Sequence, residues 1–246
     1  MSDIHRDRIG LTWAGAGVGL VLPTIITWIY FIHAAQYSPA VQQSVGLISK
    51  ILQFAFPLLW VSIVLHEPLG WPRPSGRGVL TGIGFGVLVA AAGWLVYENA
   101  LKGSAVFTAA TAQIRSKTAS FGIDSIVKYA ALGAFYSLVH SLLEEYYWRW
   151  FVFGQLRRLL PRWSAIAISA LGFMAHHVLV LSLFFGWWTW PTILFSLAVA
   201  TGGVFWAWLY ERTGSLYGPW LSHLVIDAGI FWIGYDLIGD LLTSTL

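Results

Sequence analysis

Long apolar runs separated by short polar segments recur along the whole of this 246-residue chain. A run of about 20 apolar residues is long enough to cross the hydrocarbon core of a bilayer as a helix. Only 10% of the residues are charged and 57% are hydrophobic, whereas soluble domains carry about 25% charged residues. The sequence therefore predicts an all-α, polytopic integral membrane protein, with residues 1–246 as a single transmembrane domain.

About seven of these runs are predicted to span the membrane. The first is interpreted as a retained span, because it is too long for a signal peptide and Ala34-Ala35 is a weak cleavage site. The second opens at Ser38-Pro39, which has the pattern of a helix cap followed by proline at the first helical position. The predicted spans cover residues 11–32, 39–65, 79–97, 125–155, 163–185, 192–210 and 220–238.

The segments between the spans are short, with one exception. Residues 66–78 contain three prolines and three glycines and are predicted to form a loop. The interval from Glu98 to Asp124 is rich in Ala, Ser and Thr, and we expect a surface helix or loop there and assign it no function. The pattern Gly82-x-x-x-Gly86 in the third span would permit close contact with another helix.

Basic residues are unevenly distributed between the two predicted sides of the membrane. The side that carries the N-terminus holds Arg6, Arg8, Arg73, Arg77, Arg157, Arg158, Arg162 and Arg212. The other side holds Lys50, Lys102, Arg115, Lys117 and Lys128. Because basic loops stay in the cytoplasm, we predict a cytoplasmic N-terminus and an outside C-terminus.

Composition excludes several classes of function. The chain has no cysteine, which excludes disulfides, zinc–thiolate sites and a thiol nucleophile. Its net charge of +3 is small and dispersed, so we expect no nucleic-acid partner. The expected partners are membrane lipid and a membrane-associated protein substrate, and no oligomeric state is predicted.

Two adjacent carboxylates and an arginine, Glu144, Glu145 and Arg149, interrupt the fourth span. An ionisable residue at membrane depth is costly and therefore indicates a functional site. Counted from the basic ends of their spans, Glu144 and His177 lie at roughly the same depth, about 21 to 23 Å in, and His223 lies somewhat nearer the cytoplasm. We therefore predict a polar cavity that opens toward the cytoplasm.

Residues four apart share a face of a helix. This spacing places Glu145 beside Arg149, an ion pair that could be architectural or chemical. It also pairs His140 with Glu144, Phe173 with His177, and His223 with Asp227. Only one of His176 and His177 needs to face the cavity, and we interpret His33, His66, His140 and His176 as packing residues.

These residues form three ordered motifs on separate predicted spans, within a core of about residues 125–238. The motifs are Glu-Glu-x-x-x-Arg at 144–149, Phe-x-x-x-His at 173–177 and His-x-x-x-Asp at 223–227. The set resembles the motifs of the CPBP intramembrane proteases, the family of the CAAX prenyl endopeptidases and of bacteriocin-processing and immunity-type proteins. The resemblance implies a membrane-embedded endopeptidase of glutamate type that cleaves a membrane-associated or lipidated protein.

The resemblance also implies roles for individual residues. Glu144 and His177 would activate a water molecule, and His223 and Asp227 would stabilise the oxyanion. Glu145 and Arg149 would hold their helix in register, and Phe173 would be a further supporting residue. The prenyl endopeptidases usually have Asn at the position of Asp227. Because an ionised Asp cannot donate to an oxyanion, we expect Asp227 to orient His223 by accepting from its ring N–H.

Three further hypotheses remain open at the level of sequence. His177 and His223 with Glu144 or Asp227 offer nitrogen and oxygen ligands that zinc accepts, although the chain lacks a His-Glu-x-x-His motif. A transporter or proton relay would also place Asp, Glu and His at the midplane. The third hypothesis is a non-catalytic scaffold or immunity protein. The glutamate mechanism needs no cofactor, and we expect none.

Overall fold

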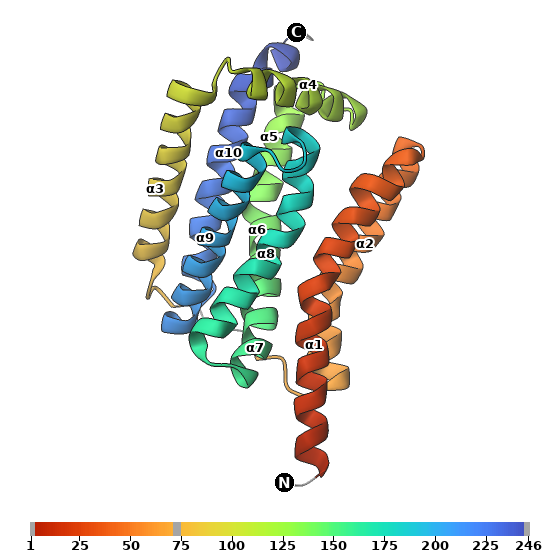
Figure 1. Cartoon of the computed structure of the whole chain (residues 1–246), viewed down its shortest axis with the longest axis vertical. Coiled ribbons are helices and arrows are strands. Elements are labelled where there is room, and N and C mark those ends of the chain that lie inside the picture. Colours follow the sequence, from red (N-terminus) through yellow and green to blue (C-terminus); the bar gives the residue numbers. More distant parts are fainter. Residues whose placement is uncertain (1–2, 71–74, 244–246) are drawn as a thin grey trace.

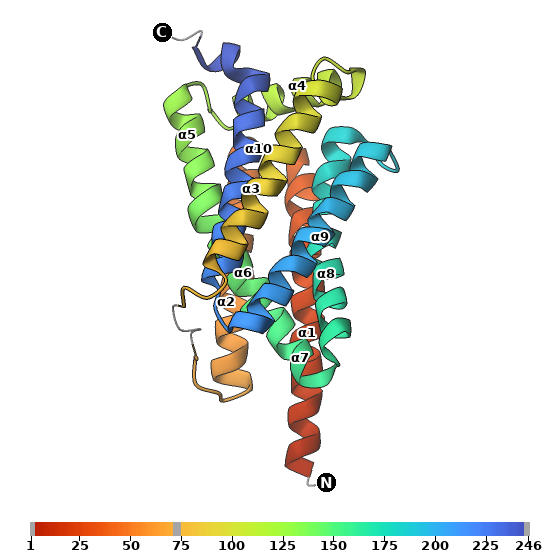
Figure 2. The same cartoon turned by 90° about the vertical axis from the view of Figure 1, so that its left-hand side faces the viewer.

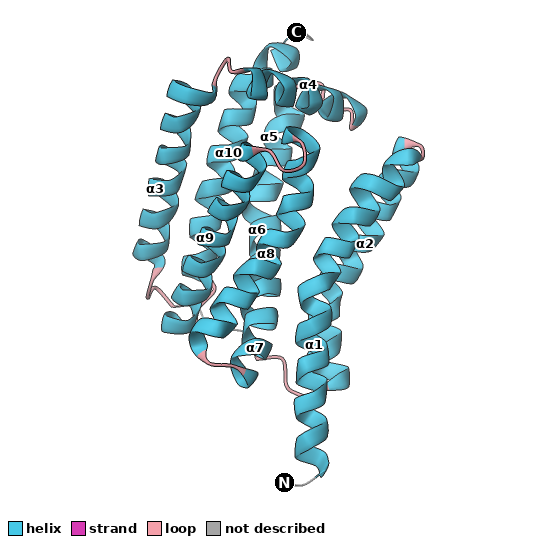
Figure 3. Ribbon diagram, viewed as in Figure 1, coloured by secondary structure: helices cyan, strands magenta, loops and turns pink. Residues whose placement is uncertain are grey.

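The structure is a computed structural model that describes the backbone of residues 3–70 and 75–243. Helices dominate these two ranges and no strand occurs in them (Figure 3). Six segments are long and apolar enough to cross a membrane: Arg6–Gln36, Pro39–Val64, Val79–Leu101, Ile126–Leu159, Arg162–Phe185 and Trp190–Thr213. They correspond to the first six predicted spans, so the prediction of an all-α polytopic membrane protein is confirmed.

The helices differ in length and in the regularity of their turns. Several long segments change from α-helical to π-helical turns near one end or in their middle. The α-helices are α1 (Asp3–Trp28), α2 (Pro39–Leu59), α3 (Val79–Val96), α4 (Ala105–Ser120), α5 (Ile126–Ala134), α6 (Ser141–Glu145), α7 (Gly154–Leu159), α8 (Arg162–Phe185), α9 (Trp190–Thr213) and α10 (Tyr217–Thr243). The π-helical stretches are Ile29–His33, Trp60–Val64, Tyr97–Leu101, Phe135–His140 and Tyr146–Phe153.

Some helix boundaries follow directly from local sequence. Ser38 accepts a hydrogen bond from the backbone N–H of Val41, and proline follows it at the start of α2, as the capping pattern predicted. The first predicted span starts at residue 11, but the helix α1 already begins at Asp3. The gap between the predicted spans 125–155 and 163–185 is also shorter in the structure, since α7 continues to Leu159 and α8 begins at Arg162.

The helices form a bundle with α1 and α2 as a pair at its side and α4 across one end (Figure 1). Figure 2 shows α10 running between α3 and α5, with α8 and α9 on the far side of α3. Helix α10 also contacts α9. Helix α4 occupies the Glu98–Asp124 interval, where it buries Phe107 and Ala110. The interval is therefore a surface helix that packs on the bundle, one of the two forms expected for it.

Helix α10 lies against α3 along the two glycines singled out in the sequence. A Cβ atom added to Gly82 would collide with the carbonyl group of Gly218, and one added to Gly86 would lie 2.7 Å from the carbonyl oxygen of Ser222. Such close approach is what small residues permit between membrane helices. The Gly82-x-x-x-Gly86 pattern thus fixes the part of α10 that precedes His223.

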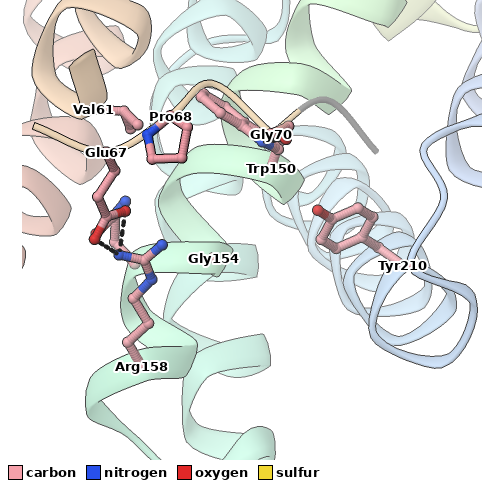
Figure 4. Close-up of a pocket in the computed structure, with 10 residues that line it drawn as sticks. Val61, Glu67, Pro68, Gly70, Trp150, Gly154, Arg158 and Tyr210 are labelled. Atoms are coloured by element: carbon pink, nitrogen blue, oxygen red, sulfur yellow. Dashed lines mark hydrogen bonds and ion pairs between the residues drawn. The ribbon is translucent and has the colours of Figure 1, made fainter. Parts of the chain in front are cut away.

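The start of α1 and the end of α7 lie at the same end of the bundle (Figure 1). Glu67, in the loop after α2, forms ion pairs with Arg8 at 3.0 Å and with Arg158 at 2.8 Å. Trp150 donates a hydrogen bond to the carbonyl oxygen of Gly70. Residues of these contacts border a cavity of about 300 Å³, which lies between the loop after α2, the helix α7 and the end of α9 (Figure 4). None of the described residues that line it belongs to the predicted catalytic set.

One basic residue used to predict the topology lies within a helix. Lys50 is counted on the outer side, and it lies inside α2, which begins at Pro39 as the capping pattern predicted. Arg73, another residue used for the topology, lies outside the described residues.

We predict that Gly86→Val separates α3 from α10 and lowers stability. Because the added side chain would meet the backbone of Ser222, which cannot move aside cheaply, the loss of unfolding free energy should be about 1–3 kcal/mol. Thermal or denaturant unfolding of the purified protein in detergent measures it. Gly84→Val is the matched control, because nothing lies within 4 Å of its Cβ position. Equal losses for the two variants would contradict the proposed contact.

Candidate active site

The motif-bearing span from Ile126 to Leu159 is an irregular helix. Its short α-helical segment α6, which carries Glu144 and Glu145, lies between π-helical stretches at Phe135–His140 and Tyr146–Phe153. Wider π-helical turns frequently occur at functional sites. Here they accompany side chains that a lipid-facing helix would not carry, since Glu144 is 4% exposed and Glu145 and Arg149 are 0% exposed.

Glu145 forms the most tightly paired group in the site. Its carboxylate accepts hydrogen bonds from Nε of Arg149 at 2.8 Å and from Nη2 of the same side chain at 3.3 Å. Nδ1 of His223, from α10, lies 3.0 Å from Oε1 of that carboxylate. The predicted ion pair with Arg149 is therefore present, and it has a third member that the spacing of residues along one helix did not reveal.

Aromatic rings enclose the two cationic or potentially cationic groups of this cluster. The guanidinium of Arg149 lies over the rings of Phe173, at 5.1 Å, and Trp206, at 5.4 Å. The ring of His223 stacks on Trp206 with centroids 4.2 Å apart. Contacts of a cation with an aromatic face are attractive, most of all away from water. Phe173 is a predicted supporting residue, whereas Trp206 carries no sequence signal that distinguishes it from the other tryptophans.

The carboxylate of Glu144 is surrounded by histidines from three helical segments. Its Oε1 atom lies 3.5 Å from Nε2 of His176. Its Oε2 atom lies 3.7 Å from Nε2 of His223 and 3.9 Å from Nδ1 of His140. These separations are longer than direct hydrogen bonds. They place Glu144 at the centre of a cluster of basic side chains.

His176 and His140 therefore contact the site, although the sequence pattern led us to interpret both as packing residues. His176 also stacks on Trp148 in a nearly parallel arrangement, with an interplanar angle of 4°. Only one of His176 and His177 needed to face the cavity, and both lie beside Glu144, because consecutive residues about 100° apart can border the same space. The adjacent histidine pair is itself the signal that could have revealed this.

His177 has a defined hydrogen bond and therefore a defined orientation. Its Nδ1 atom lies 2.9 Å from the carbonyl oxygen of Phe173. Because a carbonyl oxygen only accepts, Nδ1 carries the proton and donates it, which leaves the lone pair of a neutral ring on Nε2. The rings of His176 and His177 are 4.2 Å apart. The rings of His176 and His177 thus both lie beside the carboxylate of Glu144.

Three of these residues have the donor atoms of a metal site. One ligand atom each from Glu144, His176 and His177 lies within 4.8 Å of the others. Two imidazoles and one carboxylate form a ligand set that catalytic zinc sites use. The set differs from the one considered from the sequence, since His176 takes the place of His223.

Asp227 lies on the other side of the His223 ring from Glu145. Its Oδ1 atom is 3.6 Å from Nε2 of His223, which is beyond a direct hydrogen bond. Glu145, at 3.0 Å from Nδ1, is the carboxylate that orients the ring. Glu145 thus orients the ring of His223, the role that we expected of Asp227. The helical spacing had paired Glu145 with Arg149 alone.

The motif-bearing region matches a known protein family. Residues 126–229 match the family described as type II CAAX prenyl endopeptidase Rce1-like. The match includes all three motifs, so the resemblance noted from them is confirmed. No curated protein and no solved structure matches the chain.

We predict that Arg149→Ala and Glu145→Ala each destabilise the protein strongly. Either change leaves a charged partner unpaired in a buried, apolar environment, which costs about 3–5 kcal/mol of unfolding free energy. Equilibrium unfolding in detergent tests this. The control is Arg157→Ala, which removes an exposed pair with Glu211 and should cost at most about 1 kcal/mol.

The double variant Glu145→Gln/Arg149→Met refines this test. Because it removes both charges together, it should lose less stability than the two single alanine variants added together. An additive loss would show that the two side chains act independently.

Proposed function

We propose that the chain is an intramembrane endopeptidase of glutamate type, because residues 126–229 match the type II CAAX prenyl endopeptidase Rce1-like family. Its substrate is a membrane-associated or lipidated protein. One observation carries the proposal: the 4% exposed carboxylate of Glu144 lies within 3.9 Å of ring nitrogens of three histidines. A carboxylate in such a cluster can accept a proton and return it.

In the proposed reaction, Glu144 takes a proton from a water molecule as the water oxygen bonds to the scissile carbonyl carbon. The carbonyl electrons move to oxygen and form a tetrahedral oxyanion. When the C–N bond breaks, the carbonyl reforms and Glu144 transfers the proton to the leaving amine. His177 positions the water by accepting its second hydrogen at Nε2, because Nδ1 is engaged with Phe173. His176 holds Glu144 from the side of Oε1.

His223 is proposed to stabilise the oxyanion. Its Nδ1 proton points to Glu145, and its Nε2 atom faces the carboxylates of both Glu144 and Asp227. A lone pair on Nε2 would repel these two carboxylates, whereas a proton there attracts them. This arrangement favours a ring with two N–H groups, of which the Nε2 proton is available to a developing oxyanion. The carboxylate of Asp227 then attracts the Nε2 proton of His223 together with Glu144.

A zinc-dependent protease is the second candidate, and the ligand geometry of Glu144, His176 and His177 favours it over a transporter or a non-catalytic scaffold. In that case these three residues would hold the ion, which would supply a more acidic water and a Lewis acid for the carbonyl oxygen. His223 and Asp227 would keep the same place beside the reacting atoms.

We also propose that the end of the bundle that carries Arg8 and Arg158 faces the cytoplasm. Arg8 and Arg158 lie at the same end of the bundle, where both form ion pairs with Glu67. At the opposite end, Lys102, Arg115 and Lys128 pair with Asp236, Asp240 and Asp124. The larger number of Arg and Lys residues in the short loops of the first end is the pattern of a cytoplasmic surface.

We predict that Glu144→Gln abolishes proteolysis while the protein still folds and inserts. The amide cannot accept the water proton, so turnover should fall by at least about a hundredfold. Comparison of protein termini in membranes from cells with the wild type and with this variant identifies the substrates. Glu98→Gln is the control, because Glu98 is exposed and pairs only at the bundle surface with Lys102. Processing that survives Glu144→Gln would exclude the mechanism.

Chelation of the purified enzyme separates the two candidates. Under the glutamate mechanism, activity toward the substrate so identified persists after exhaustive chelation. If zinc is required, chelation abolishes activity, zinc restores it, and His176→Ala loses bound metal by elemental analysis. We expect the first result, with His176→Ala lowering turnover.

Topology can be tested independently of activity. Because the predicted number of spans is odd, a reporter before Met1 should lie in the cytoplasm and one after Leu246 should lie outside. Paired fluorescence and alkaline phosphatase fusions, which are active on opposite sides of a bacterial membrane, provide the measurement. Both reporters on one side would contradict the seven-span topology.

A further inference from the structure

The cavity between the loop after α2, the helix α7 and the end of α9 has no part in the proposed reaction (Figure 4). Its volume of about 300 Å³ is at the lower end of the range for sites that bind small molecules. Three spans end beside it, namely Pro39–Val64, Ile126–Leu159 and Trp190–Thr213. The cavity therefore lies at the level where membrane helices leave the hydrocarbon region and the lipid headgroups begin.

One side of the cavity carries an excess of positive charge. Arg8 and Arg158 share the single carboxylate of Glu67, at 3.0 and 2.8 Å. Only Nη1 of Arg158 donates to this carboxylate, and Nη2 and Nε have no partner among the described residues. Tyr210 lies across the cavity, with its hydroxyl directed toward the pair of Glu67 and Arg158 (Figure 4). These donors match an anion such as a phosphate.

The same cavity also has a hydrogen-bond acceptor that lacks a donor. Gln155 lines it and is 3% exposed, and its Oε1 atom has no partner in the described part of the chain. Such a buried acceptor is costly, so its presence calls for a donor from outside the chain. Gly214, another lining residue, follows the last residue of α9, and the C-terminal end of a helix favours positive charge. These groups match an ammonium.

We propose that this cavity binds the headgroup of phosphatidylethanolamine, with the phosphodiester beside Arg158 and Tyr210 and the ammonium donating to Gln155. This headgroup joins the two charges that the cavity receives on its two sides. Basic pockets between membrane helices on the cytoplasmic side bind lipid headgroups, and the bilayer supplies such groups at this level. The proposal goes beyond the proteolytic function and does not depend on it.

A bound headgroup would connect two helices that carry parts of the candidate active site. Gln155 and Arg158 belong to α7, which continues the motif-bearing span. Tyr210 lies one turn after Trp206, whose ring stacks on His223. Because a ligand that binds only the folded state stabilises it, the lipid should also raise the unfolding temperature of the protein.

Retention of lipids by the purified protein tests the proposal. The protein in detergent receives equimolar phosphatidylethanolamine and phosphatidylcholine with the same acyl chains, and native mass spectrometry measures how much of each stays bound. Both lipids have the phosphodiester, but the trimethylammonium of phosphatidylcholine cannot donate a hydrogen bond. Phosphatidylethanolamine should be retained about tenfold more, the factor expected of one hydrogen bond from a charged group. Equal retention of the two lipids would overturn the proposal.

Gln155→Met should abolish this preference. The lipid-free variant should be at least as stable as the wild type, because the change removes an acceptor that had no partner. Ser196→Ala is the matched control, since Ser196 is also buried with an unpartnered oxygen but does not line this cavity. A preference that survives Gln155→Met, or that Ser196→Ala also removes, would contradict the role of Gln155.

Arg158→Gln should weaken the retention of both lipids, because it removes the group beside the phosphodiester. The change also breaks an ion pair of Glu67, so it is compared with Arg8→Gln. That variant breaks the other ion pair of Glu67, although Arg8 does not line the cavity. Equal losses in the two variants would show that the loop after α2 controls binding and would overturn the contact with Arg158.

Two competitors define the ligand. Phosphatidylglycerol has the phosphodiester with hydroxyl groups in place of the ammonium, and we expect it to be retained less than phosphatidylethanolamine. Stronger retention of phosphatidylglycerol would show a site for an anion alone and would overturn the proposal. Free phosphoethanolamine has the headgroup without acyl chains. If it displaces phosphatidylethanolamine at equal concentration, the ligand is a soluble molecule and the assignment to a membrane lipid is wrong.

Discussion

The carboxylate of Glu145 is the interaction on which the site depends. Its Oε1 atom is shared by Arg149, at 3.3 Å, and by His223, at 3.0 Å. At this depth none of the three groups can find water, and an ionised group without a partner would cost several kcal/mol. The rotation of α10 relative to the motif-bearing helix is thereby fixed. Glu144 directly precedes Glu145 in the chain, so the same constraint directs its carboxylate toward the histidines.

Apolar and small residues also hold the turn of α10 that carries His223. Trp206 of α9 stacks on His223 and donates a hydrogen bond to Ser222 at 3.0 Å, which places it against the same turn of α10. Gly86 of α3 meets that turn from another side. The position of His223 is therefore determined by two further helices, α9 and α3, as well as by Glu145. Rigid support of this kind is what a group that must stabilise a transition state requires.

The sequence was sufficient for features that lie within one helix and insufficient for those that join two. The ion pair of Glu145 and Arg149 follows from their spacing, and the spans follow from apolar length. The contact of Glu145 with His223 depends on how α10 is rotated, which periodicity does not encode. The approach of His176 to Glu144 was missed for the same reason. The π-helical stretches beside α6 further alter the periodicity of 3.6 residues per turn on which assignments of helix faces depend.

The two basic residues that lie within predicted spans differ in how they are held. The guanidinium of Arg149 is fully buried and is held by a carboxylate and two aromatic rings, although its Nη1 atom has no hydrogen-bond partner among the described residues. The Nζ atom of Lys50 has an amide oxygen and one ring instead. Because an ionised partner offsets more of the cost of burying a charge than a neutral amide does, the contact of Arg149 contributes more to the fold than that of Lys50.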